Sequence, residues 1–201
     1  MYASVALNDK YYVLNEGNVY EIKKEFYEDY LEAYKGLDIF QPLDNGIKNQ
    51  TERNYLEKIC SSNANLVLVD RKLVYKNRGG FEPCDIFNID DNNFIHVKRY
   101  GSSKILSHLF AQAVVSADLF MNTGIKEEVI KILQPLSPKK EFKKLDYSDC
   151  KVSMAIITEK EIPKDGIVKI PFFSMVNVVR TVNQIKKWGY KGVGLMFIKA
   201  D

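Results

Sequence analysis

The chain has 201 residues, of which 46% are hydrophobic, so it can bury the core of one domain. Its net charge of +3 does not indicate a general attraction to nucleic acid, and any basic surface must be local. No apolar run approaches the roughly 20 residues that span a bilayer, and no export signal is evident. The three cysteines, Cys60, Cys84 and Cys150, lack a CxxC spacing, which predicts reduced thiols in a cytoplasmic protein without a structural zinc site.

Residues 1–50 predict a hairpin followed by a helix. In the hairpin at 10–24, apolar and aromatic positions flank a turn in which Gly17 can adopt a positive φ. The helix at 25–35 has apolar residues at helical spacing and ends at Gly36.

Residues 51–135 predict the core of the fold. A helix at 51–62 with Thr51 as N-cap precedes a strand at 64–76. A hairpin with a polar turn at 90–93 follows, and then a long amphipathic helix that starts near Ser102 or Ser103. The helix stripe comprises Leu106, Leu109, Phe110, Ala113, Val114, Ala117 and Phe120. A further helix is predicted at 124–134, and Pro135 with Pro138 should end it.

Residues 136–201 predict a strand at 151–162, a helix capped by Gly189 and a final strand at 190–200. Such a strand–helix–strand unit gives a parallel pair. The whole chain therefore predicts a single α/β domain with a mixed central sheet flanked by helices.

The hairpin of the core brings reactive side chains together. If its turn is centred between Asp90 and Asp91, residue 85 lies opposite residue 96. Because side chains alternate along a strand, His96 and Lys98 share the face opposite to Ile95 and Val97. An acid, an imidazole and an amine would then gather on one face of the sheet.

The order of these residues resembles the layout of the PD-(D/E)xK nucleases, which implies a restriction-endonuclease-like core. Glu57 lies on a helix, Asp85 and Lys98 lie on the hairpin, and Gln112 lies on the next helix. In that layout the acids hold divalent metal, Mg²⁺ or Mn²⁺. A metal ion contacts the scissile phosphate and lowers the pKa of a bound water, which the lysine helps to orient or activate.

The motif departs from the nuclease layout because His96 stands where the second acid is expected. Imidazole binds Mg²⁺ poorly and favours softer metals such as Mn²⁺ or Zn²⁺. Three interpretations follow. Glu82 or Glu57 could supply the missing carboxylate, His96 could be a metal ligand or general base, or the site could have lost catalysis.

The stretch EPCDIF…IHVKRYGSSKILSHLFAQAVVSADLF, with LNEGNVYEI and IPFFSMVNVVRTVNQIKKWGY, resembles a sporadically distributed bacterial family of uncharacterised proteins found near restriction and phage-defence genes. The resemblance implies a role in defence. Usual members are much longer, which implies an N-terminal partner domain outside this chain. The positions that match the family pattern are Glu57, Glu82, Asp85, His96, Lys98, Ser103, Ser107, His108 and Gln112.

The first functional hypothesis is a metal-dependent nuclease that acts on DNA, or alternatively RNA. Asp85 would hold the metal with Glu57 or Glu82, Lys98 would position water with the help of His96, and Gln112 would orient the phosphate. A homodimer would suit cleavage of both strands.

Two alternatives give the chain no catalysis. One is a nucleic-acid-binding module, whose contacts would come from Lys98, Arg99, Ser103, Lys104, His108 and the basic loop at 139–144. The other is an assembly domain of a larger defence protein.

Overall fold

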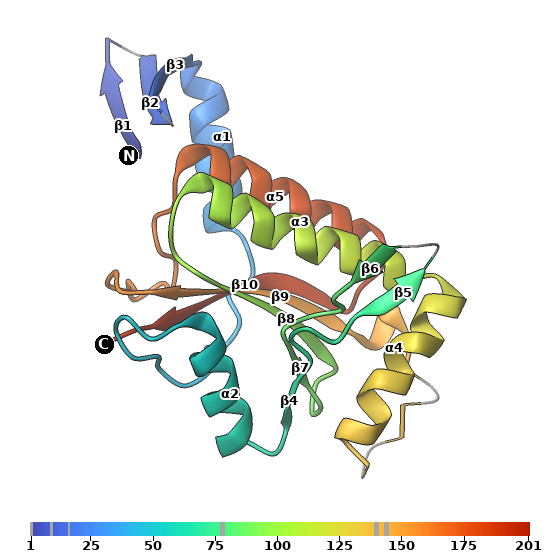
Figure 1. Ribbon diagram of the computed structural model, residues 1–201. Coiled ribbons are helices and arrows are strands. Elements are labelled where there is room, and N and C mark those ends of the chain that lie inside the picture. The colour runs from blue at the N-terminus through green and yellow to red at the C-terminus, as the bar shows by residue number, and fades with distance from the viewer. Residues whose placement is uncertain (1, 9, 16, 77–78, 139–140, 143–144) are drawn as a thin grey trace.

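A five-stranded mixed sheet forms the centre of the protein (Figure 1). The computed structural model describes residues 2–8, 10–15, 17–76, 79–138, 141–142 and 145–201. In spatial order the strands are β10 (Gly192–Lys199), β9 (Lys151–Thr158), β8 (Asn93–Arg99), β7 (Ile86–Asn88) and β4 (Leu66–Leu68). The three strands β4, β7 and β8 are antiparallel, whereas β8, β9 and β10 run parallel to one another. The predicted α/β class with a mixed sheet is confirmed.

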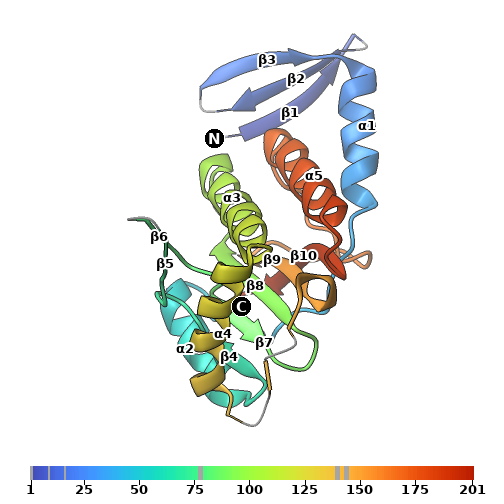
Figure 2. The same cartoon turned by 90° about the vertical axis from the view of Figure 1, so that its right-hand side faces the viewer.

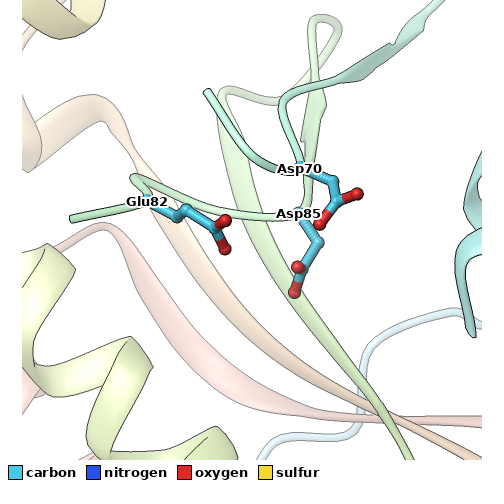
Figure 3. Close-up of side chains that lie close together, drawn as sticks. All are labelled: Asp70, Glu82 and Asp85. Carbon is cyan, nitrogen blue, oxygen red and sulfur yellow. The ribbon is translucent and has the colours of Figure 1, made fainter. Parts of the chain in front are cut away.

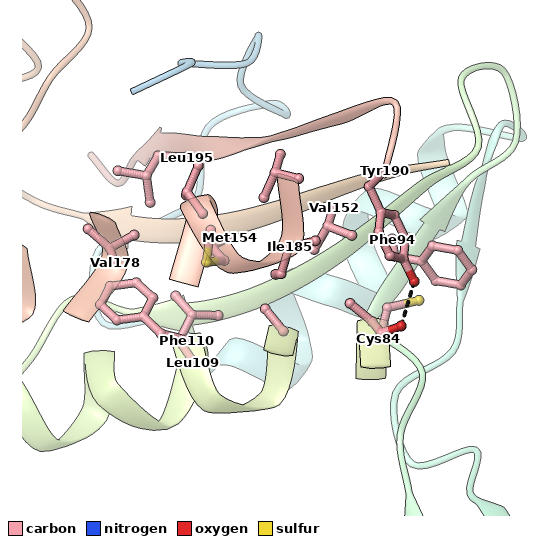
Figure 4. Packing of buried hydrophobic residues seen from close by; sticks show 14 of the residues in the cluster. Cys84, Phe94, Leu109, Phe110, Val152, Met154, Val178, Ile185, Tyr190 and Leu195 are labelled. Carbon is pink, nitrogen blue, oxygen red and sulfur yellow. Dashed lines mark hydrogen bonds between the residues drawn. The ribbon is translucent and has the colours of Figure 1, made fainter. Parts of the chain in front are cut away.

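Helices cover both faces of this sheet. Figure 1 shows α3 (Ser103–Phe120) and α5 (Phe172–Lys187) side by side on one face and α2 (Glu52–Ser62) on the other. The face under α3 and α5 carries the larger apolar cluster, in which Leu109, Met154 and Val178 pack together (Figure 4). The α2 face carries a smaller cluster that includes Ile95 and Val97. The alternation predicted for β8 is therefore observed.

The core helices form where their sequences predict them. Thr51 caps α2, since its Oγ1 accepts a hydrogen bond from the Asn54 amide at 3.2 Å. Six residues of the predicted apolar stripe of α3 are fully buried, and Val114 packs against the core at its margin.

The helix predicted at 124–134 is α4 (Thr123–Leu136), which ends between Pro135 and Pro138, but it extends two residues further than predicted and includes Pro135. Proline lacks an amide donor, but it lies in the last turn, where the Ser137 amide still bonds to the Leu133 carbonyl at 3.1 Å.

A second, three-stranded antiparallel sheet precedes the core. It consists of β1 (Tyr2–Leu7), β2 (Lys10–Asn15) and β3 (Asn18–Ile22), and α1 (Lys24–Lys35) follows it. The hairpin predicted at 10–24 is β2–β3, and Gly17 in its turn has a φ of +84°; β1 was not predicted. Tyr27 of α1 stacks on both Tyr11 of β2 and Phe172 of α5, which ties this sheet to the main body (Figure 2).

The strand predicted at 64–76 is split into β4 and β5 (Val74–Lys76). Between them the chain turns at Arg71, whose φ is +63°. β5 pairs with β6 (Gly79–Phe81) in a two-stranded ribbon beside α3, and a short 3-10 helix, η1 (Tyr147–Asp149), precedes β9 (Figures 1 and 2).

No single helix among the described residues is long and apolar enough to cross a membrane, and α3 and α4 satisfy that test only as a pair bent by 108°.

Candidate metal centre

Three carboxylates converge at the end of the sheet where β4 and β7 meet (Figure 3). They belong to Asp70, which follows β4, to Glu82, which follows β6, and to Asp85, which precedes β7. One oxygen from each lies within 4.8 Å of the others. This spacing lets the three side chains share one cation.

Backbone hydrogen bonds hold the two contributing segments together. The carbonyl of Asp85 accepts from the amides of both Val69 and Asp70, at 2.9 and 3.0 Å. The carboxylate of Glu82 accepts from the Arg71 amide at 3.1 Å. The turn after β4 is thereby fixed against the segment that leads into β7.

Asp85 is the most buried of the three acids, with 3% of its surface exposed. Its Oδ2 accepts a hydrogen bond of 2.6 Å from the Val97 amide of β8. Burial raises the pKa of Asp85 to about 7, against the opposing effects of the Val97 amide and the Lys98 charge, while Glu52 and Glu82 raise it further. The ionised form of this carboxyl is thus destabilised without a nearby cation.

Lys98 lies on β8 beside Asp85. Its Nζ is 2.6 Å from Oε1 of Glu52 in the first turn of α2, and the two side chains are 20% and 29% exposed. Burial is the largest influence and lowers the pKa of Lys98, but the bond to Glu52 and the charges of Asp85 and Glu82 together raise it above its usual value. Lys98 therefore stays protonated next to the acids.

Glu57 lies outside the group of three carboxylates. Its side chain is 49% exposed and pairs with Arg53 at 2.7 Å, and Arg53 also binds Asp70 at 2.8 Å. Glu57 thus reaches the carboxylates only through Arg53.

His96 faces α3, on the side of β8 opposite to Ile95 and Val97. It is 2% exposed, and its Nε2 lies 2.9 Å from the Ser116 hydroxyl. Burial, assisted by the charge of Lys98, lowers the pKa of His96 to about 3, so the ring is neutral. The predicted register is observed, since Ile86 pairs with Ile95, but the carboxylate group does not include His96.

Gln112 and His108 of α3 line a cavity of about 480 Å³ that also borders Glu82. The Oε1 atom of Gln112 is buried and has no hydrogen-bond partner among the described residues. Gln112 and Glu82 thus line one cavity, and Glu82 is also one of the three carboxylates.

The residues predicted to contact nucleic acid are dispersed. Arg99 binds the Gln50 carbonyl and Glu159, and Ser103 donates to Asn15 at 3.0 Å. Lys104 is exposed on α3. Most of the basic loop at 139–144 lies outside the described residues.

Sequence reasoning missed Asp70 and Glu52. Asp70 directly follows the apolar run Leu66–Val69, where a polar residue ends a buried strand, and this is the one signal that could have drawn attention to it. Glu52 lies in the first turn of α2, where acidic residues are common, so its position gives no such signal.

Fold and site together define an α/β protein with an acidic centre at the end of a mixed sheet. The model of DUF6119, a family of unknown function, matches residues 1–199, so the chain belongs to this family. No curated protein and no solved structure matches the chain.

Proposed function

We propose that this protein is a metal-dependent phosphodiesterase of the nuclease type, with Asp70, Glu82 and Asp85 as the metal ligands. The observation that carries the proposal is the approach of three carboxylates to within 4.8 Å of one another, next to a half-buried lysine on the adjacent strand. A carboxyl whose pKa is raised by burial, as in Asp85, beside other charged groups is typical of sites that bind a cation or act in catalysis.

The ligand chemistry favours Mg²⁺ or Mn²⁺, because both accept hard carboxylate oxygens. A divalent cation bound there would contact a phosphate oxygen and lower the pKa of a bound water. Lys98 would donate to the attacking water or to the phosphate, and Glu52 holds its ammonium group in place.

The order of elements supports the comparison with PD-(D/E)xK nucleases. A helix, three antiparallel strands, a second helix and a parallel strand occur in this chain order as α2, β4, β7, β8, α3 and β9, with the β5–β6 ribbon inserted after β4, and α4 and η1 inserted after α3. Asp85 precedes the second of these strands and Lys98 lies on the third. Asp70 and Glu82 offer the carboxylates that His96 does not. We assign the substrate as DNA or RNA and, from the resemblance in sequence, the setting as bacterial defence.

Cleavage assays with Mg²⁺ or Mn²⁺ test the proposal. We expect Asp85→Ala to lose both metal binding and cleavage. We expect Lys98→Ala to bind metal but to cut at least about 100-fold more slowly, since acid–base groups contribute about that much. Lys187→Ala, which changes an exposed lysine on α5, is the matched control. The proposal is wrong if folded Asp85→Ala and Lys98→Ala proteins cut as well as the parent.

The neutral, hydrogen-bonded state of His96 favours one alternative, a module that binds nucleic acid without cutting it. In that case binding would weaken steeply with salt and would not need metal. Binding that is insensitive to EDTA, combined with no cleavage of any substrate, would support this second function.

A further inference from the structure

The cavity beside the acidic centre has the chemistry of a binding site for a planar ring. It measures about 480 Å³, within the range of small-molecule sites, and lies between the β5–β6 ribbon and α3. Its apolar lining includes Leu73, Phe81 and Val115. Leu73 is 40% exposed and Val115 is 50% exposed, so these apolar groups face an open space.

The polar part of the lining consists of Glu82, His108, Gln112 and Ser116, and two of these side chains offer acceptors. Gln112 lines the cavity, and its Oε1 atom is shielded from solvent and lacks a partner among the described residues. Glu82 contributes a carboxylate, which can accept several hydrogen bonds. A buried acceptor without a partner is costly, so a ligand that brings N–H donors would gain free energy here.

We propose that this cavity binds an unpaired nucleobase of the substrate strand and prefers bases that carry an exocyclic amino group. The inference rests on the proposed function and names the form of its substrate. Phe81, Leu73 and Val115 would pack on the faces of the ring. An amino group has two N–H donors for the two acceptors, Gln112 and Glu82, whereas the ring N–H of thymine or uracil offers one.

Glu82 connects the cavity to the metal centre, because its side chain belongs to both. A base held in the cavity would therefore belong to a nucleotide whose phosphate lies near the three carboxylates. A base within a duplex cannot enter such a pocket without leaving the stack. The substrate is accordingly single-stranded or carries a flipped-out base.

Binding of short oligo-dC and oligo-dT to the full chain in EDTA, measured by fluorescence anisotropy, tests the inference. The two oligonucleotides have equal charge, so the ratio of their affinities cancels the electrostatic contribution. We expect oligo-dC to bind about tenfold more tightly, which corresponds to the usual discrimination by a good base contact. Equal affinities for oligo-dC and oligo-dT would overturn the preference.

Variants locate the binding in the cavity. Gln112→Leu should abolish the preference for dC. Val115→Trp, which fills the cavity, should weaken the binding of both oligonucleotides at least about tenfold, as expected for loss of a stacked base. The control is Ile105→Trp, at an apolar position of α3 that is 43% exposed and outside the lining of this cavity. Binding by Val115→Trp equal to that of the parent would overturn the placement.

Competition by free dCMP distinguishes a site for a nucleic-acid strand from a site for a mononucleotide. We expect it to compete weakly with oligo-dC, and dCMP that binds as tightly as oligo-dC would overturn the assignment to a strand.

Metal titration keeps this inference distinct from the proposed function. Val115→Trp should bind Mn²⁺ as the parent does, whereas Asp85→Ala should lose the metal and keep its preference for dC. If the parent binds no metal but prefers oligo-dC, the nuclease assignment is wrong and the base site is supported. If the parent binds metal and cuts, and Val115→Trp cuts equally well, the base site is wrong and the nuclease assignment stands.

Discussion

His96 and Lys98 lie two residues apart on β8, yet they have opposite environments. His96 is buried against Ser116 of α3, whereas Lys98 bonds to Glu52 of α2 beyond the part of β8 that pairs with β7. The difference arises because β7 pairs with β8 only as far as Ile86 and Ile95. Beyond that pair, the side chain of Asp85 takes the Val97 amide in place of a neighbouring strand. Polar chemistry concentrates where the strand partner ends.

The same position explains the charges of the two groups. Burial keeps the imidazole neutral by lowering its pKa. The hydrogen-bond partner of His96 among the described residues is the Ser116 hydroxyl, which carries no negative charge to offset that effect. The ammonium group is also partly buried, but three carboxylates nearby raise its pKa. The presence or absence of nearby carboxylates thus separates a structural polar group from one that can act on a ligand.

The largest expected effect is on metal binding, and it distinguishes Asp70, which the structure places among the grouped carboxylates, from Glu57, which the sequence predicted as a ligand. Asp70→Ala should weaken Mn²⁺ binding at least about 100-fold, since even residues that only support ligands contribute 10- to 100-fold. Glu57→Ala removes a carboxylate that pairs with Arg53 on the surface, so it should change binding no more than about threefold. Isothermal titration calorimetry of both variants measures this difference.

Arg53 provides the control for an indirect effect, because it contacts both acids. Arg53→Ala should leave the metal bound. Equal losses in Asp70→Ala and Glu57→Ala would restore the assignment of Glu57 and contradict the structure of the centre.

The second expected effect is on the stability of the fold, and it tests whether His96 of β8 is a buried neutral group. The pKa of His96 is about 3 in the folded protein and 6.5 when exposed, so protonation favours the unfolded chain below pH 6.5. Stability should therefore fall as the pH falls, by about 2 kcal/mol between pH 7 and pH 5 from this residue alone. Urea unfolding of the parent and of His96→Gln, which can still bond to Ser116, measures the contribution.

The two proteins share every other titrating group, so the difference between their pH profiles isolates His96. If the parent and His96→Gln lose the same stability between pH 7 and pH 5, the imidazole is not a buried neutral group. Metal affinity of His96→Gln should equal that of the parent at pH 7.5, because His96 bonds to Ser116 and is not one of the three grouped carboxylates.

Local patterns predicted much of this architecture. The turn at 90–93 set the pairing of Ile86 with Ile95, and the stripe from Leu106 to Phe120 set the buried face of α3. Asp85 and Lys98 were found because both lie on or beside one hairpin. Asp70 was not, because its place depends on backbone bonds from the turn after β4 to the Asp85 carbonyl, and pairing between distant segments leaves no periodic signal.

The smallest expected effect concerns the ion pair that holds Lys98. Glu52→Gln should cost about 1 kcal/mol of stability, because the pair is partly buried, and it should lower the pKa of Lys98 by removing its bonded carboxylate. Glu57→Gln breaks a more exposed i,i+4 pair and should cost only about 0.3 kcal/mol. NMR titration of the lysine side chains and urea unfolding measure both quantities. If Glu52→Gln leaves the Lys98 titration unchanged, then Asp85 and Glu82 alone fix the charge, and Lys98 is free to turn toward a ligand without the help of α2.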